Sequence, residues 1–110
     1  MPEAPRELEA FIDEGLRLAR ARGFPNAGFV QMRRRYGTME AITRLVTSGE
    51  IKGGLVRMVE LDLADWTIDA AVVGRFREYF PAAVREAAAW RLAEAKARYS
   101  RTAIRGREEP

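Results

Sequence analysis

Apolar residues recur at three- and four-residue steps through most of the chain, a spacing that places side chains on one face of an α-helix. The first such stripe runs from Leu8 to Ala19. Acidic residues fill the first half of this segment and arginines the second, which complements the helix macrodipole. Gly23 can adopt a left-handed cap and Pro25 prevents continuation. The pattern therefore predicts a helix over residues 5–22.

Short apolar stripes separated by glycines predict three further helices in the middle of the chain. Asn26 is a good N-cap for the second helix, which ends at Gly37. A third helix is expected over 38–47 and closes at Ser48-Gly49. Adjacent glycines at 53 and 54 predict a sharp turn before a fourth helix that carries Leu55, Val56, Met58 and Val59.

The acidic stretch 61–65 is too short to form a sheet without a partner strand, so we expect a single extended turn. Thr67 is a plausible N-cap for the next helix, with Asp69 in its first turn. Gly74 is expected to break that segment in two. Pro81 suits the first position of a last, alanine-rich helix that ends near residue 99.

The predicted fold class is all-α: one compact domain of five to six short helices over residues 1–100, followed by a frayed polar tail over 101–110. No valine or isoleucine positions form a sustained alternating strand pattern. The predicted core is Phe11, Ile12, Leu18, Phe29, Met32, Ile42, Leu45, Leu55, Val59, Leu63, Val72, Phe76, Phe80, Val84 and Leu92.

The 110 residues include neither cysteine nor histidine. This removes disulfides, thiolate nucleophiles, imidazole bases and most transition-metal and haem sites. We therefore expect a protein that is not an enzyme and carries no cofactor. No apolar run reaches the length of a membrane span, and residues 1–6 lack the pattern of a signal peptide, so the expected location is the cytoplasm without a membrane partner.

Positive charge is concentrated in the middle of the chain. Residues 17–57 hold nine basic side chains against two acidic ones, whereas residues 1–16 and 58–70 each carry a net charge of about −4. Arginines 33–35 are followed by Tyr36, a combination that can contact phosphates and stack on a base. The candidate nucleic-acid-binding residues are Arg33, Arg34, Arg35, Tyr36, Arg44 and Lys52. The alternative is a solvated or protein-binding basic face, because consecutive helical residues point about 100° apart.

The two short helices around Gly37 also resemble a helix-turn-helix. The match is imperfect, because Arg33 occupies the position where such motifs place a small residue. If the motif were real, the groove-facing residues would be Thr38, Glu40, Thr43 and Arg44.

The two tryptophans are candidate partner-binding residues, since tryptophan is enriched at interface hot spots. Trp90 lies off the inward stripe of the last helix, and Trp66 precedes a cap where it could cover the core. They support an alternative function, a protein-interaction or self-associating subunit without nucleic-acid binding.

Two weaker alternatives involve metal ions. Glu50-Ile51-Lys52 has the spacing of a metal-dependent nuclease motif, but it adjoins two glycines rather than lying on a strand. A second group of carboxylates could hold magnesium or calcium, although it lacks the spacing of a calcium loop. That group consists of Glu60, Asp62, Asp65 and Asp69.

Several short motifs between residues 16 and 93 resemble a family of small helical bacterial proteins and C-terminal modules with no established activity. The resemblance implies a compact helical module and no particular reaction. Thr38 and Met58 depart from the pattern. The matching residues are Phe24-Pro25, Phe29 with Met32, Tyr36-Gly37, Glu40-Ala41, Gly53-Gly54, Leu61-Asp62-Leu63, Thr67 and Arg91-Leu92.

The sequence as a whole favours a small non-catalytic binding module. Its arginine-rich middle helices would contact an acidic partner, most plausibly DNA or RNA.

Overall fold

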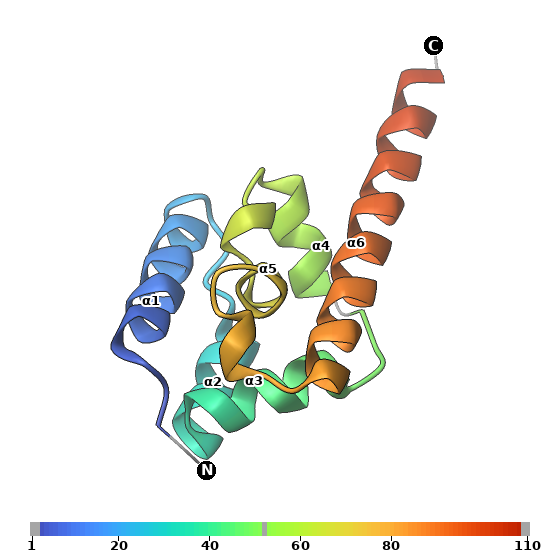
Figure 1. The fold of residues 1–110 in the computed structure, drawn as a ribbon. Helices are drawn as coiled ribbons and strands as arrows, with labels where there is room; N and C mark the ends of the chain where they lie inside the picture. Colours follow the sequence, from blue (N-terminus) through green and yellow to red (C-terminus); the bar gives the residue numbers. More distant parts are fainter. Residues whose placement is uncertain (1–2, 52, 109–110) are drawn as a thin grey trace.

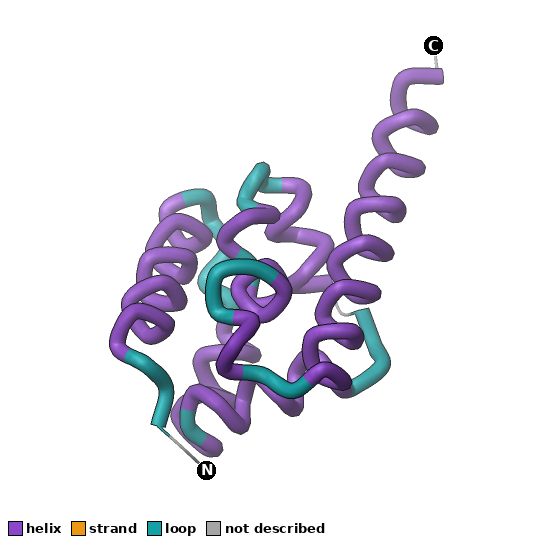
Figure 2. The backbone as a smooth tube through the Cα atoms, in the orientation of Figure 1, coloured by secondary structure: helices purple, strands orange, loops and turns teal. Residues whose placement is uncertain are grey.

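The structure is a computed structural model that describes residues 3–51 and 53–108. Its described residues form α-helices and short 3-10 helices and no strand, which confirms the all-α prediction (Figures 1 and 2). The elements are α1 (Arg6–Ala21), α2 (Ala27–Tyr36), α3 (Thr38–Thr47), α4 (Gly53–Glu60), η1 (Ala64–Trp66), α5 (Ile68–Val73), η2 (Arg77–Tyr79) and α6 (Ala82–Glu108).

The short helix α5 lies at the centre of the molecule, between α1 on one side and α6 on the other (Figure 1). Helices α3, α4 and α5 all pack against α6, and α2 packs against α3. The largest group of buried apolar residues draws on α1, α2, α3, α5 and α6 and includes Leu8, Ile42 and Val72. This arrangement gives every short helix a buried apolar face, which compensates for its few internal hydrogen bonds.

Ten of the fifteen predicted core residues are buried. The other five are partly buried and pack against the core: Phe11, Leu18, Met32, Leu45 and Leu92. The predicted core residues therefore do lie in or against the core, which also contains buried alanines such as Ala41 and Ala88.

The predicted helix ends at Gly23 and Thr67 are confirmed. Gly23 has a φ of 88°, and the Phe24 N–H donates to the carbonyl of Ala19 at 2.9 Å, closing α1. The Thr67 hydroxyl accepts from the N–H of Ala70 at 3.0 Å, as an N-cap of α5.

Three local predictions are wrong in detail. Asn26 occupies the N-cap position of α2 but has a left-handed backbone (φ 50°), so its side chain makes no capping hydrogen bond. The glycines at 53 and 54 lie inside the first turn of α4 rather than in a bend. The segment after α4 is not extended, because Asp62 is left-handed (φ 60°) and Leu63 N–H donates back to Met58.

The last helix is longer than predicted. It continues through residues 100–108, past the expected end near Tyr99, and projects beyond the other helices (Figure 1). No proline interrupts this stretch, and Glu94 forms ion pairs with Arg98 and Arg101 at 3.4 and 3.5 Å, which support the helix. Among the described residues, no helix has the length and apolarity needed to cross a bilayer.

Candidate functional site

Arg33 is not part of an open basic face. Its guanidinium lies between two carboxylates of α1, 2.7 Å from Glu9 and 2.7 Å from Asp13. Thr38 completes the network, because its hydroxyl donates to Glu9 at 2.6 Å. Burial opposes the charged form of Arg33, but the hydrogen bonds to Glu9 and Asp13 outweigh it and raise the pKa of Arg33. This arginine therefore joins α1 to α2.

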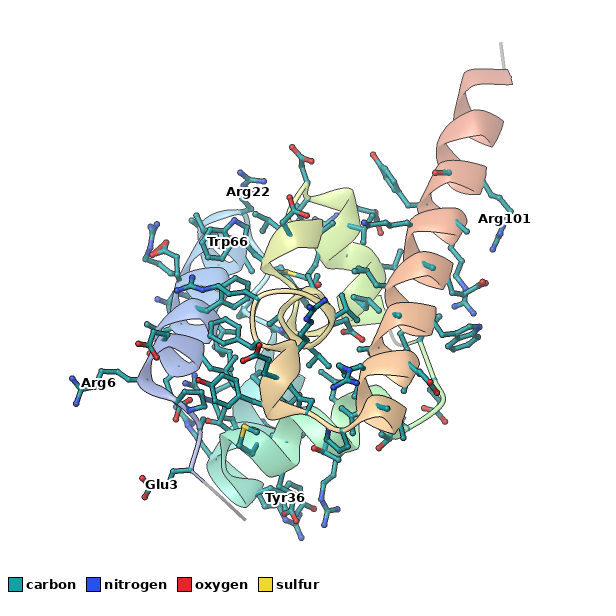
Figure 3. All side chains as sticks on the ribbon, in the orientation of Figure 1. Glu3, Arg6, Arg22, Tyr36, Trp66 and Arg101 are labelled. Atoms are coloured by element: carbon teal, nitrogen blue, oxygen red, sulfur yellow. The ribbon has the colours of Figure 1, made fainter. Side chains whose placement is uncertain are left out.

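Two other arginines of the basic segment, Arg35 and Arg44, lie near the ring of Tyr36. The Arg44 guanidinium lies 3.9 Å from the ring centroid and that of Arg35 lies 5.3 Å from it. Both distances are typical of cation–π contacts. Figure 3 shows Tyr36 at the lower edge of the molecule, and its side chain is half-buried.

Arg34 and Tyr36 line the same open polar groove of about 580 Å³. Within the described part of the chain, Arg34 and Arg35 form no ion pair, and Arg44 has a long one of 3.6 Å to Glu40. We call Arg34, Arg35, Tyr36 and Arg44 the Tyr36 cluster. Lys52, the remaining candidate, lies outside the described residues.

The helix-turn-helix interpretation is wrong for Thr38. This residue is buried and bonded to Glu9 of α1, so it cannot face a DNA groove. The Thr43 hydroxyl donates to the carbonyl of Met39 within its own helix at 3.0 Å. Of the four residues that the motif needs, Glu40 and Arg44 are paired with each other instead.

The two tryptophans occupy different environments. Trp66 is half-buried and its ring stacks on Phe11, with centroids 5.1 Å apart, at the upper left of Figure 3. Trp90 on α6 is 54% exposed. Trp90 is therefore the tryptophan with a surface available to a partner.

The acidic residues around α4 and α5 are not gathered into a metal site. No group of three or more carboxylates that could hold a metal ion occurs among the described residues. Glu60 forms an ion pair of 3.7 Å with Arg57, and Asp62 terminates α4 in a left-handed conformation. Asp69 faces inward.

Asp69 and Arg91 form a buried ion pair that sequence reasoning missed. The Oδ2 atom of Asp69 lies 3.3 Å from Nη1 of Arg91, and each side chain is only 2% exposed. Nη1 also donates to the carbonyl of Leu45 at 2.8 Å. Neither Asp69 Oδ2 nor Arg91 Nε has a hydrogen-bond partner in the part of the chain that the structure describes. Burial raises the pKa of Asp69 to about 6, and the charge of Arg91 only partly opposes this rise.

One sequence signal could have revealed this pair. Arg91 falls seven residues after Val84 and four before Ala95, so it occupies the inward stripe of the last helix. A charge on an apolar stripe needs a buried partner, because desolvation of an unpaired ion is very costly. The inward position of Arg91 therefore calls for an acidic residue on a neighbouring helix.

The pair lines a cavity of about 430 Å³ between α1, α2, α4, α5 and α6. Most of the lining is apolar and includes Ile12, Phe29, Met58 and Trp66. A volume of this size is within the range of small-molecule sites. Comparison of the chain with protein-family models, curated proteins and solved structures finds no match.

Proposed function

We propose that the protein is a non-catalytic binding module that contacts single-stranded nucleic acid through the Tyr36 cluster. The observation that carries the proposal is the contact of Arg44 and Arg35 with one tyrosine ring at the molecular edge, at 3.9 and 5.3 Å. Proteins that bind single strands combine cationic side chains for the phosphates with planar groups on which bases stack.

Each residue of the cluster has a separate role in this proposal. Arg34 and Arg35 contact phosphates, because they form no ion pair within the described chain that would compete. The ring of Tyr36 and the guanidinium plane of Arg44 provide the stacking surface. Arg33 is excluded, since Glu9 and Asp13 neutralise it.

A titration of fluorescein-labelled oligonucleotides tests the proposal. Thymidine and uridine single strands of about 12 nucleotides, and a duplex of equal length, are added at about 50 and 200 mM salt. With two to three phosphates neutralised, single-strand affinity should fall roughly tenfold between the two salt concentrations. Substituting Tyr36→Leu should weaken binding by about fivefold or more without altering this salt dependence.

A matched pair of double variants distinguishes binding through the Tyr36 cluster from binding through the positive charge of the protein as a whole. Arg34→Ala with Arg35→Ala should weaken binding at least about fivefold. Arg6→Ala with Arg20→Ala removes the same charge from exposed positions of α1 and should leave affinity almost unchanged. Equal losses in both, or no binding at the lower salt concentration, contradict the proposal. Arg33 is left intact because its replacement would disturb the fold.

Trp90 favours a second candidate function, self-association through α6. A tryptophan that is 54% exposed on a long helix can lie at the centre of an interface. Sedimentation velocity over a wide concentration range at high salt tests this candidate. A dimer that Trp90→Ala dissociates would support it, whereas a monomer at every concentration would remove it.

A further inference from the structure

The buried pair of Asp69 and Arg91 has unused hydrogen-bonding capacity. Oδ2 of Asp69 is an acceptor and Nε–H of Arg91 is a donor, and both are buried with no hydrogen-bond partner among the described residues, although Oδ2 forms the ion pair with Nη1 of Arg91. Buried polar groups without a partner are rare, because each one loses its hydration. Both residues line the cavity of about 430 Å³, so a molecule bound there lies against the ion pair.

The rest of the cavity is suited to an apolar body. Its walls include aromatic and aliphatic side chains from three regions, namely Phe29 of α2, Met58 of α4 and Trp66 of η1. Gly54 adds no side chain to the wall: a Cβ atom there would lie 3.5 Å from the ring of Phe24. A mainly apolar cavity with a few polar groups at one place is the usual form of a small-molecule site.

We propose that this cavity binds a small, uncharged, largely apolar molecule with a carboxamide-type head group. The head group would donate an N–H to Asp69 Oδ2 and accept the Nε–H of Arg91. The site is dipolar and carries no net charge when both residues are ionised. A charged head group would therefore meet a like charge as well as an opposite one, and an ester would leave Asp69 without a donor.

Three probes with one ring system distinguish these possibilities: 2-naphthamide, methyl 2-naphthoate and the 2-naphthoate anion. Each is titrated into nitrogen-15-labelled protein at about pH 7, above the pKa of Asp69. Two-dimensional NMR follows three N–H groups, those of Arg91 Nε, the Trp66 indole and the Trp90 indole. Trp66 and Arg91 line the cavity, whereas Trp90 is exposed on α6 and serves as an internal control.

We expect 2-naphthamide to shift the Arg91 and Trp66 signals along one saturable curve, with a Kd of about 100 µM, and to leave Trp90 unmoved. The methyl ester and the anion should bind at least about tenfold more weakly, because each leaves a buried group unpaired. Saturable shifts with no preference among the probes would overturn the head-group assignment. If none of the probes gave a saturable shift, the proposal of a binding site would be overturned, and the cavity would hold only water.

A variant without the charges provides the second test. Asp69→Leu combined with Arg91→Met removes both ions together, a change that folded proteins tolerate better than loss of one partner. The Leu45 carbonyl keeps a partner, because the Ser48 hydroxyl donates to it at 3.0 Å. The variant should bind 2-naphthamide and methyl 2-naphthoate equally. If the variant still preferred the amide to the ester tenfold, the proposal would be contradicted. If the variant does not fold, the shift of the Arg91 Nε–H signal in the unaltered protein still tests the proposal.

Discussion

Arg91 on α6 donates a hydrogen bond of 2.8 Å to the carbonyl oxygen of Leu45, two residues before the end of α3. The last carbonyls of a helix have no partner within it, so a cationic side chain is a favourable one. The same guanidinium lies 3.3 Å from Asp69 of α5. One buried arginine thus holds three helices together, and its environment determines how stability depends on pH.

Asp69→Asn should change the pH dependence of stability. The folded-state pKa of Asp69 is about 6, above the ordinary value of 3.8. A raised carboxyl pKa adds stability below the unfolded-state pKa, and this contribution is lost as pH rises through the folded-state pKa. Relative to the unaltered protein, the unfolding free energy of the Asn variant should therefore rise by about 2 kcal/mol between about pH 4 and pH 7.

Urea denaturation at several pH values measures this difference directly. Asp65→Asn, at an exposed position of η1, is the matched control. A constant offset between the Asp69 variant and the unaltered protein across the whole range would show that the carboxyl does not titrate in this window.

Arg33→Ala should destabilise the fold even though it removes a member of an arginine run. It breaks the contacts to Glu9 and Asp13 that join α1 to α2. Since Asp13 is largely exposed, solvent screens part of the interaction, and we expect a loss of about 1–2 kcal/mol. Denaturant melts of Arg34→Ala supply the comparison, with an expected change within about 0.5 kcal/mol. Indistinguishable losses in the two variants would count against the network.

Two glycines in helices should respond oppositely to alanine. A Cβ on Gly15 would lie 2.9 Å from the backbone oxygen of Trp66, whereas one on Gly28 would meet nothing within 4 Å. Gly15→Ala should therefore cost about 1–2 kcal/mol through overpacking. Gly28→Ala should gain about 0.5–1 kcal/mol from helix propensity. Thermal melts compare the two, and a stabilised Gly15→Ala variant would refute the close packing of α1 on η1.

Thr67→Ala should lower the unfolding free energy by about 1–2 kcal/mol. The substitution removes the cap on the Ala70 N–H and also the hydroxyl's hydrogen bond of 2.8 Å to the carbonyl of Ala64. Thr67→Ser keeps both hydrogen bonds and should recover most of the lost unfolding free energy. Differential scanning calorimetry of the two variants measures this difference. A serine variant as unstable as the alanine variant would assign the effect to the methyl group.

Helix boundaries were the most predictable part of the fold, because glycines and capping residues act locally. The predicted 38–47 helix agrees with α3, and the left-handed Gly23 ends α1 as its sequence context requires. Local signals failed at Asn26, which is left-handed and makes no capping hydrogen bond, and at the glycines before Leu55, which belong to α4.

The candidate site was less predictable, because its residues meet through tertiary contacts. Arg33, Arg34 and Arg35 are equivalent in sequence, yet only Arg33 faces the carboxylates of α1. Helical spacing shows that these three point in different directions, but not which element each one meets. Asp69 and Arg91 are 22 positions apart on separate helices, so no motif spacing links them.

Because α6 is long, a small tilt of its packed part produces a larger displacement at its far end. Ala95 is the last buried residue in the part of α6 whose burial is described, which ends at Arg101, and the helix continues to Glu108. Thirteen residues at 1.5 Å each extend about 20 Å beyond that point, so a tilt of about 10° moves the end by about 3 Å. Arg91 lies one turn before Ala95. A spectroscopic label at the far end of α6 would therefore report, in amplified form, any repacking around the cavity.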